Sequence, residues 1–269
     1  MRNWKWIAAI GVLGGVFAAQ AQTEVPKTPR APHLWQVPAP RTAADAYFTN
    51  LKSGDKIETP YLLKFGLSGG WGLAPIAKPM GGKSGHHHLL VNRNLPLNFK
   101  EALPFNDEYI HFGSGQMETV LTLPPGTYTL RMLLADSQHL PHFVYSKPTK
   151  VTVTKKNATD PKSLVVKGIA MQVGPSSKDG TVKVPFRVQF HASGMNVGHL
   201  SQHQPDTGHF RLTVVSKRGT TAEMDFVDGE TETWLAPPAG DYQMTLDFVD
   251  NVDDGKTLSS ALPVNVRVQ

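Results

Sequence analysis

Short apolar segments recur from about Tyr47 to the C-terminus, and Gly, Pro, Asn and Asp separate them. Within several segments apolar and polar residues alternate with the period of two that is typical of half-buried β-strands. In the first half of the chain the pattern predicts strands at 61–65, 88–91, 119–123, 128–134 and 151–153. Strands this short, at this spacing, predict an all-β fold built as an immunoglobulin-like β-sandwich.

The same series of segments occurs twice along the chain. Four blocks recur in one order: SGDKIETP with KDGTVKVP, LKFGLSG with VQFHASG, GHHHLLV with GHFRLTV, and LPPGTYTLRMLLAD with APPAGDYQMTLDFVD. Repetition of whole blocks indicates duplication of one structural unit. We therefore predict two tandem immunoglobulin-like β-sandwich domains, a first at 45–155 and a diverged repeat at 165–269, joined by the lysine-rich stretch 155–163.

Each copy has a tyrosine shortly after a proline-rich turn, Tyr128 in the first and Tyr242 in the second. We expect these tyrosines to lie on edge strands. In sandwich folds such a tyrosine commonly donates its hydroxyl to a backbone carbonyl near a corner. The prediction for both residues is therefore structural.

The N-terminal residues have the features of a targeting segment. Arg2 and Lys5 precede an apolar run of about 13 residues, too short for the roughly 20 of a spanning helix, and Ala19-Gln20-Ala21 matches a cleavage pattern. We predict a signal peptide at 1–21 and a proline-rich linker at 22–44, in which Leu34 and Trp35 tuck the arm onto a domain. The mature chain is then expected to be periplasmic or secreted, with no membrane span; the alternative is an uncleaved anchor.

Composition excludes several classes of chemistry. The formal net charge is +5 without any dense run of Lys or Arg, which argues against a nucleic-acid partner. There is no cysteine, so thiolate nucleophiles and Cys-ligated metals are excluded. No nucleophile elbow, Walker loop, zincin motif or dinucleotide fingerprint is present, and we expect a protein that is not an enzyme.

Histidines provide the best candidate chemistry, and six of them fall in three segments of the first copy. They are His86, His87, His88, His111, His139 and His142. Strand alternation places His86 and His88 on one face and His87 on the other. Imidazole suits copper, zinc and nickel, so histidines meeting at strand ends predict a metal site, with Asp136, Asp107 and Glu108 as candidate oxygen ligands or supports.

Other interpretations of the histidines stay open. They could hydrogen-bond loop carbonyls and order the rim of the domain, or they could recognise a small molecule or glycan. In the second copy His86 aligns with His209, whereas His87 and His88 align with Phe210 and Arg211, so a shared site would be degraded there. That copy has a weaker cluster of its own, with His191, Met195, His199 and His203.

The first copy resembles a bacterial family of unknown function, DUF4399, through FGLSGGWGLAP, GHHHLLVN, NDEYIHFGSGQMETVLTLPPGTYTL and LLADSQHLPH. The resemblance covers about 90–100 residues by these motifs and implies an exported β-domain with histidines at the six positions named above. It implies no established activity.

Together these observations predict an exported binding protein that holds a copper or zinc ion through the first domain. The alternative is a metal-free immunoglobulin-like module that binds a protein of the cell envelope. The expected partners are thus a metal ion or an envelope protein; the oligomeric state stays open.

Overall fold

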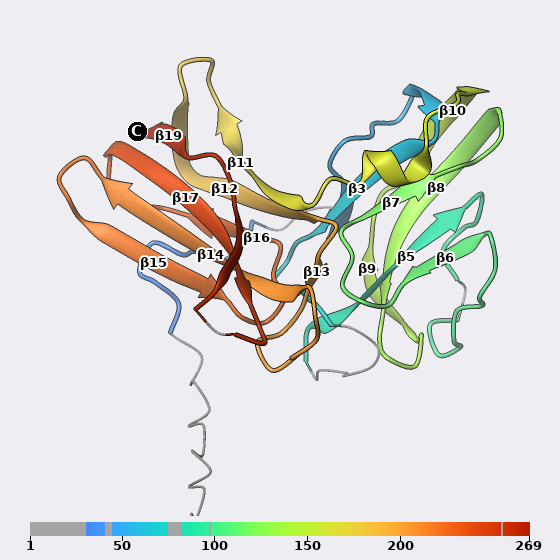
Figure 1. Cartoon of the computed structure of the whole chain (residues 1–269), viewed down its shortest axis with the longest axis horizontal. Helices are drawn as coiled ribbons and strands as arrows, with labels where there is room; N and C mark the ends of the chain where they lie inside the picture. The colour runs from blue at the N-terminus through green and yellow to red at the C-terminus, as the bar shows by residue number, and fades with distance from the viewer. Residues whose placement is uncertain (1–30, 41–44, 75–81, 97, 254) are drawn as a thin grey trace, which may run out of the picture. The chain divides into compact units, whose positions relative to one another are not determined.

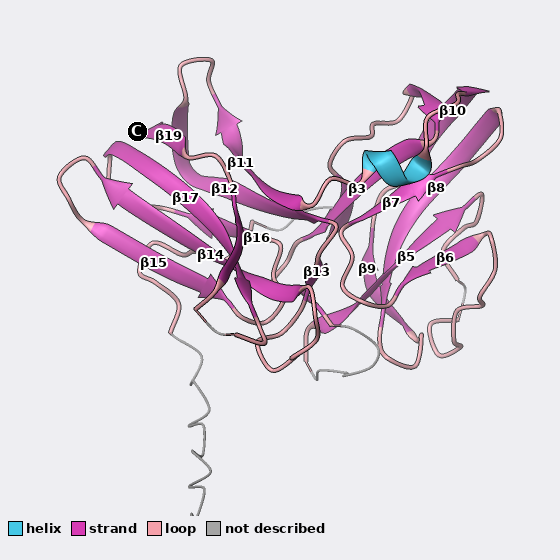
Figure 2. Cartoon of the chain, in the orientation of Figure 1, coloured by secondary structure: helices cyan, strands magenta, loops and turns pink. Residues whose placement is uncertain are grey.

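The computed structural model describes residues 31–40, 45–74, 82–96, 98–253 and 255–269. The predicted signal peptide at 1–21, and residues 22–30 and 41–44 of the predicted linker, lie outside these residues. Ala31–Gln269 form one compact unit. In the described residues every regular element is a strand except a single 3-10 turn, η1 (Pro161–Leu164), which Figure 2 shows in cyan.

The first ten strands form two sheets, which we call the first module (Figure 1). One sheet has the order β1-β3-β7. The other has the order β2-β10-β8-β5-β4, with β6 paired to β5 and β9 paired to β8. The bounds are β1 Ala46–Phe48, β2 Lys56–Thr59, β3 Tyr61–Leu67, β4 Gly72–Leu73, β5 Ser84–Val91, β6 Tyr109–Phe112, β7 Glu118–Leu121, β8 Gly126–Ala135, β9 Pro141–Tyr145 and β10 Thr149–Lys156.

The remaining nine strands form the second module, whose hydrogen-bonded order is β11-β12-β19-β17-β14-β13. Strands β15, β16 and β18 pair with β14, β12 and β17. The bounds are β11 Gly168–Ser176, β12 Thr181–Ser193, β13 Asn196–Val197, β14 Thr207–Ser216, β15 Thr221–Phe226, β16 Glu232–Leu235, β17 Gly240–Asp250, β18 Thr257–Ser260 and β19 Val264–Val268. The fold is all-β with immunoglobulin-like sandwich sheets, as the alternation predicts.

Both corner tyrosines behave as predicted, but their strands do not. The Tyr128 hydroxyl donates to the Pro124 carbonyl at 2.9 Å, and the Tyr242 hydroxyl donates to the Pro238 carbonyl at 2.8 Å. However, β8 lies between β10 and β5, and β17 lies between β19 and β14. The edge-strand prediction was wrong, because a tyrosine at the first residues of a long strand reaches the preceding turn from a central position as well as from an edge.

Strand β5 has two different faces, and this places the histidines. His87, Leu89 and Val91 point to one side, where Leu89 and Val91 belong to the main hydrophobic core. On the other side, Leu90 packs in a smaller cluster with Leu103, Leu133 and Ala135. We call this second side the outer face of the sheet. It is covered by side chains of the 92–108 segment, among them Leu95, Phe99 and Leu103, so residues on it are buried although they lie outside the main core.

The proline-rich arm reaches the second module. Gln36 forms an antiparallel bridge with Leu235, and the Trp35 ring lies edge-on to Tyr242 with 5.6 Å between centroids. Trp35 therefore packs on a domain as predicted. Leu34 does not, because it is 94% exposed. No helix in the described ranges has the length and apolar character required to cross a bilayer.

Candidate metal centre

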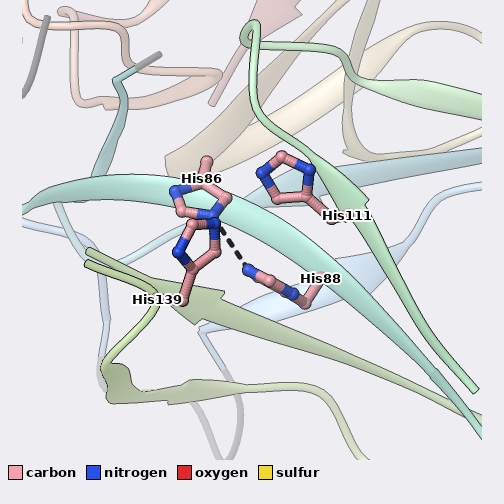
Figure 3. Close-up of side chains that lie close together, drawn as sticks. All are labelled: His86, His88, His111 and His139. Carbon is pink, nitrogen blue, oxygen red and sulfur yellow. Dashed lines mark hydrogen bonds between the residues drawn. The ribbon is translucent and has the colours of Figure 1, made fainter. Parts of the chain in front are cut away.

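Four histidines come together on the outer face of the first module (Figure 3). His86 and His88 are two residues apart on β5, so the pleat points both to the same side. His111 lies on β6 directly opposite His88 in the antiparallel register. His139 comes from the turn between β8 and β9. We call these four residues the four-histidine cluster.

The imidazoles of the cluster are close enough to share one ion. One ligand nitrogen from each residue lies within 4.8 Å of the others, and the Nε2 atoms of His86 and His88 are 2.8 Å apart. Nitrogens about 2.0–2.1 Å from one metal lie at most about 4.2 Å apart. The most widely separated nitrogens would therefore have to approach each other by at least about 0.6 Å to close the set on a metal.

The turn that carries His139 is held by Asp136. One carboxylate oxygen of Asp136 accepts the backbone N–H groups of Gln138 at 2.8 Å and Leu140 at 2.9 Å. The His139 carbonyl in turn accepts the Leu103 N–H at 2.9 Å. Asp136 thus positions the turn, and it is not part of the four-histidine cluster.

The other two candidate acids are also outside the cluster. Glu108 accepts hydrogen bonds from the Arg93 guanidinium on the surface, and Asp107 is exposed. The suggestion of a direct oxygen ligand is therefore not supported by the geometry. Within the described residues the candidate ligand set consists of imidazoles alone.

Burial keeps the strand histidines neutral. His86 and His88 are 1% and 0% exposed. Desolvation, followed by the neighbouring His111, His139, His87 and His142 rings, lowers the pKa of His86 to about 3. Desolvation, followed by His86, His111, His139 and His87, lowers the pKa of His88 to about 2. Burial and His139 also lower the pKa of His111. Neutral imidazoles with free lone pairs are the form that ligates metals.

Most buried ring nitrogens of the cluster have no hydrogen-bond partner. These atoms are Nδ1 of His86 and His88, and Nε2 of His111 and His139. Buried polar atoms are almost always satisfied in folded proteins, so four orphaned nitrogens within one group of rings require an explanation. The interpretation in which each ring hydrogen-bonds a loop carbonyl does not account for these atoms.

The remaining two predicted histidines lie outside the cluster. His87 points to the opposite face, as alternation predicts, and lies edge-on to Phe65 with 4.9 Å between centroids. Burial lowers the pKa of His87 to about 3. His142 packs against Trp71 at 4.8 Å between centroids, and its Nε2 is buried without a partner. The structure therefore brings together four of the six predicted residues.

The second module replaces the cluster with an ion pair. Arg211, at the position of His88, lies opposite Asp225 just as His88 lies opposite His111. The Arg211 guanidinium donates to the Asp225 carboxylate at 2.5 Å. His209, at the position of His86, is 2.7 Å from the Asn251 side-chain oxygen. As predicted, the second copy does not keep the histidine cluster, and other polar pairs occupy the equivalent positions.

The weaker histidine cluster of the second copy does not assemble. His191 contacts Glu118 of the first module at 2.9 Å, and His199 contacts Asp228 at 3.3 Å. Met195 is buried. In the part of the chain that the structure describes, these residues do not form a group that could hold a metal.

Sequence reasoning missed two residues around these sites. The Phe105 ring lies 4.5 Å from the His139 ring and 5.2 Å from the His111 ring between centroids, yet it is 63% exposed. Glu118 holds both His191 and the Ser193 hydroxyl, at 2.9 and 2.6 Å. No local pattern marked either residue, because their partners lie far away in the sequence.

Comparison with known proteins identifies a family. The family model described as Domain of unknown function (DUF4399) matches residues 63–154 and 188–269. A search of curated proteins gave no match.

Three solved structures align with most of this chain, each at a TM-score below 0.5. Fibronectin(III)-like modules of Clostridium thermocellum CbhA align at 11% identity and a TM-score of 0.26, covering 83% of this chain and 92% of that chain. Two fibronectin type-III domains of chicken tenascin align at 13% identity and a TM-score of 0.23, covering 82% of this chain and 95% of that chain. The FN1–FN3 domains of chicken CNTN1 align at 9% identity and a TM-score of 0.24. This alignment covers 82% of this chain and 64% of that chain.

Proposed function

The chain belongs to the family described as Domain of unknown function (DUF4399), and we propose that its first module binds one transition-metal ion, copper or zinc. The ligands in this proposal are the four imidazoles of His86, His88, His111 and His139. Imidazole nitrogen is a common ligand of both metals.

One observation carries this proposal. Four imidazoles from three separate segments converge, and buried nitrogens among them have no partner in the protein. A shared ion would take one nitrogen from each ring and offset the unfavourable desolvation of the rings. The all-histidine set also suits an oxidising compartment, where a thiolate ligand would be vulnerable.

We further propose that the protein acts in the periplasm or outside the cell. The support comes from the sequence of the first 21 residues, with a positive start, a short apolar run and a small-residue cleavage pattern. Detection of the mature N-terminus at Gln22 in a periplasmic or secreted fraction would test this part of the proposal.

Isothermal titration calorimetry with Zn²⁺ and Cu²⁺ tests the metal site. We expect one ion per chain, and at least a 100-fold loss of affinity when His86 and His88 are both replaced by alanine. His203→Ala is the matched control, because His203 is an exposed histidine outside the cluster. Heat no greater than the blank, or equal binding by the double variant, would reject the proposal.

An interaction module without metal is the alternative function. Phe105 and Phe143 are 63% and 76% exposed. Phe143 stacks on Phe99, which covers the outer face, and Phe105 lies against the His139 ring. Exposed aromatic residues are typical anchors of protein interfaces. If this alternative holds, adding Zn²⁺ or Cu²⁺ will leave the melting temperature unchanged.

A further inference from the structure

We propose that the four-histidine cluster selects a cuprous ion, Cu⁺, over divalent ions, because it is an uncharged ligand set among buried apolar side chains. This inference rests on the proposed function, since it concerns which ion the same site prefers.

The ligands supply no negative charge. Within the described residues no carboxylate joins the cluster. The acid on the turn, Asp136, is committed to two backbone N–H groups, and Glu108 is paired with Arg93 on the surface. Neither Asp136 nor Glu108 is therefore available to compensate the second positive charge of a divalent ion.

The β8 residues that pair with the two strand histidines are apolar. In the antiparallel pairing of β5 with β8, His86 lies opposite Ala135 and His88 lies opposite Leu133. Both of these residues are fully buried, as is Leu90, the next outer-face residue of β5. Phe105 packs edge-on against His111 and His139 on the solvent side. Water is thus kept from one nitrogen of each ring, Nδ1 of His86 and His88 and Nε2 of His111 and His139.

A cationic side chain on the same face of the sheet adds to the effect. Arg131 lies opposite Leu90 and is two residues before Leu133, so it is on the outer face of β8. Its Nε is buried and has no hydrogen-bond partner. A guanidinium keeps its positive charge in proteins, and it therefore raises the electrostatic cost of placing a second cation nearby.

Physical chemistry then favours the ion of lower charge. Transfer of an ion into a low-dielectric site is unfavourable unless an opposite charge compensates it, and this cost rises with the square of the ionic charge. Imidazole ligates both copper states, so charge decides between them. Zn²⁺ and Cu²⁺ leave a net charge of +2 at the centre, whereas Cu⁺ leaves +1.

The redox potential of the copper-loaded protein tests this inference. We expect the association constant of the protein for Cu⁺ to exceed that for Cu²⁺ by at least about 100-fold, each measured from the aqueous ion. That ratio raises the Cu²⁺/Cu⁺ potential by about 120 mV over aqueous copper, at about 59 mV per tenfold change for one electron. Zn²⁺ is expected not to displace equimolar Cu⁺ under anaerobic ascorbate.

Adding a carboxylate to the cluster gives a sharper test. His139→Asp, on the turn, is expected to lower the potential by at least about 59 mV, or tenfold in relative affinity. His203→Asp makes the same change at an exposed histidine and is expected to leave the potential unaltered. His111→Asp serves as the second variant, and circular dichroism verifies that each protein is folded.

The possible outcomes separate the two proposals. A raised potential that falls in the His139→Asp variant supports the inference. A potential at or below that of aqueous copper, or displacement of Cu⁺ by Zn²⁺, overturns the preference for Cu⁺ while the metal site remains. Failure of every metal to bind overturns the site itself and the inference with it.

Discussion

At the scale of single residues, position on the pleat decides what each histidine does. His86 and His88 belong to the four-histidine cluster, whereas His87, between them, lies against Phe65 in the core. The equivalent of His87 in the second module is Phe210, which is fully buried and packs against Phe248. His87 therefore occupies a position that the same fold also fills with a wholly apolar ring.

This comparison gives a pH prediction for His87→Phe. Burial depresses the folded-state pKa of His87 to about 3, so below the unfolded value of about 6.5 the unfolded chain binds more protons. The folded protein must then lose stability as pH falls from about 6.5, by up to about 1.4 kcal/mol per pH unit for this group. In His87→Phe this part of the slope should vanish.

Urea unfolding of the metal-free protein at pH 7, 6 and 5 measures the effect. The slope of unfolding free energy against pH should be smaller in His87→Phe than in the natural protein, and metal affinity at pH 7 should be unchanged. His203→Phe, at an exposed position, is the control. Identical slopes in the two variants would contradict the assignment.

At the scale of elements, two strands and one turn position the four rings of the cluster. The strand β5 and its neighbour β6 place three rings by register, whereas the fourth depends on the short turn between β8 and β9. His139 has a positive φ of 64°, a conformation that non-glycine residues adopt infrequently. The hydrogen bonds to Asp136 hold the turn that contains this residue.

Asp136→Ala should therefore weaken metal binding without removing a ligand. Loss of the carboxylate frees two backbone N–H groups and the turn, and outer residues of this kind typically change metal affinity about 10–100-fold. Calorimetry with Zn²⁺ or Cu⁺ measures the change. Asp107→Ala removes an exposed acid from the neighbouring segment and should bind normally. Equal affinities in both variants would show that the turn does not need Asp136.

At the scale of the whole molecule, the two modules contact each other through residues that follow β6 in the chain. Gly115, three residues after β6, accepts a hydrogen bond at its carbonyl from the Val197 N–H at 2.9 Å. Glu118, at the start of β7, holds His191 and Ser193 of β12. Desolvation opposes ionisation of Glu118, but these hydrogen bonds outweigh it and lower its pKa. The carboxylate thus contributes stability above the unfolded pKa of about 4.3, which is lost as pH falls through the folded value.

Gly115→Ala should disrupt this contact. A Cβ at Gly115 would lie 2.0 Å from the Val197 carbonyl oxygen, and its φ is +90°. Because the clash is with backbone, we expect a loss of more than about 2 kcal/mol of stability. Gly54→Ala is the matched control, since its φ is +95° but nothing lies within 4 Å of the added Cβ. Thermal unfolding of both variants separates the contact from the backbone conformation, and an equal loss in both would contradict the prediction.

Much of the fold was predictable because its causes are local. Alternation located β3, β7, β8 and β10 to within a few residues, and the block repeats indicated the two modules. The strand that carries His86 begins at Ser84, earlier than its apolar residues suggest, because buried histidines interrupt the apolar pattern. The central position of β8 was not predictable, since pairing partners depend on residues far apart in the chain.

The sequence by itself determined the all-β class, the repeat, the family, and which face of its strand each of His86, His87 and His88 occupies. These follow from the two-residue period of a strand and from the order of motifs. Only the tertiary structure decided that His111 and His139 join His86 and His88. It also decided that Asp136 supports the turn and that apolar side chains of β8 lie next to the rings. The reason is that strand register and turn geometry bring distant segments together, and no local pattern encodes the distances between them.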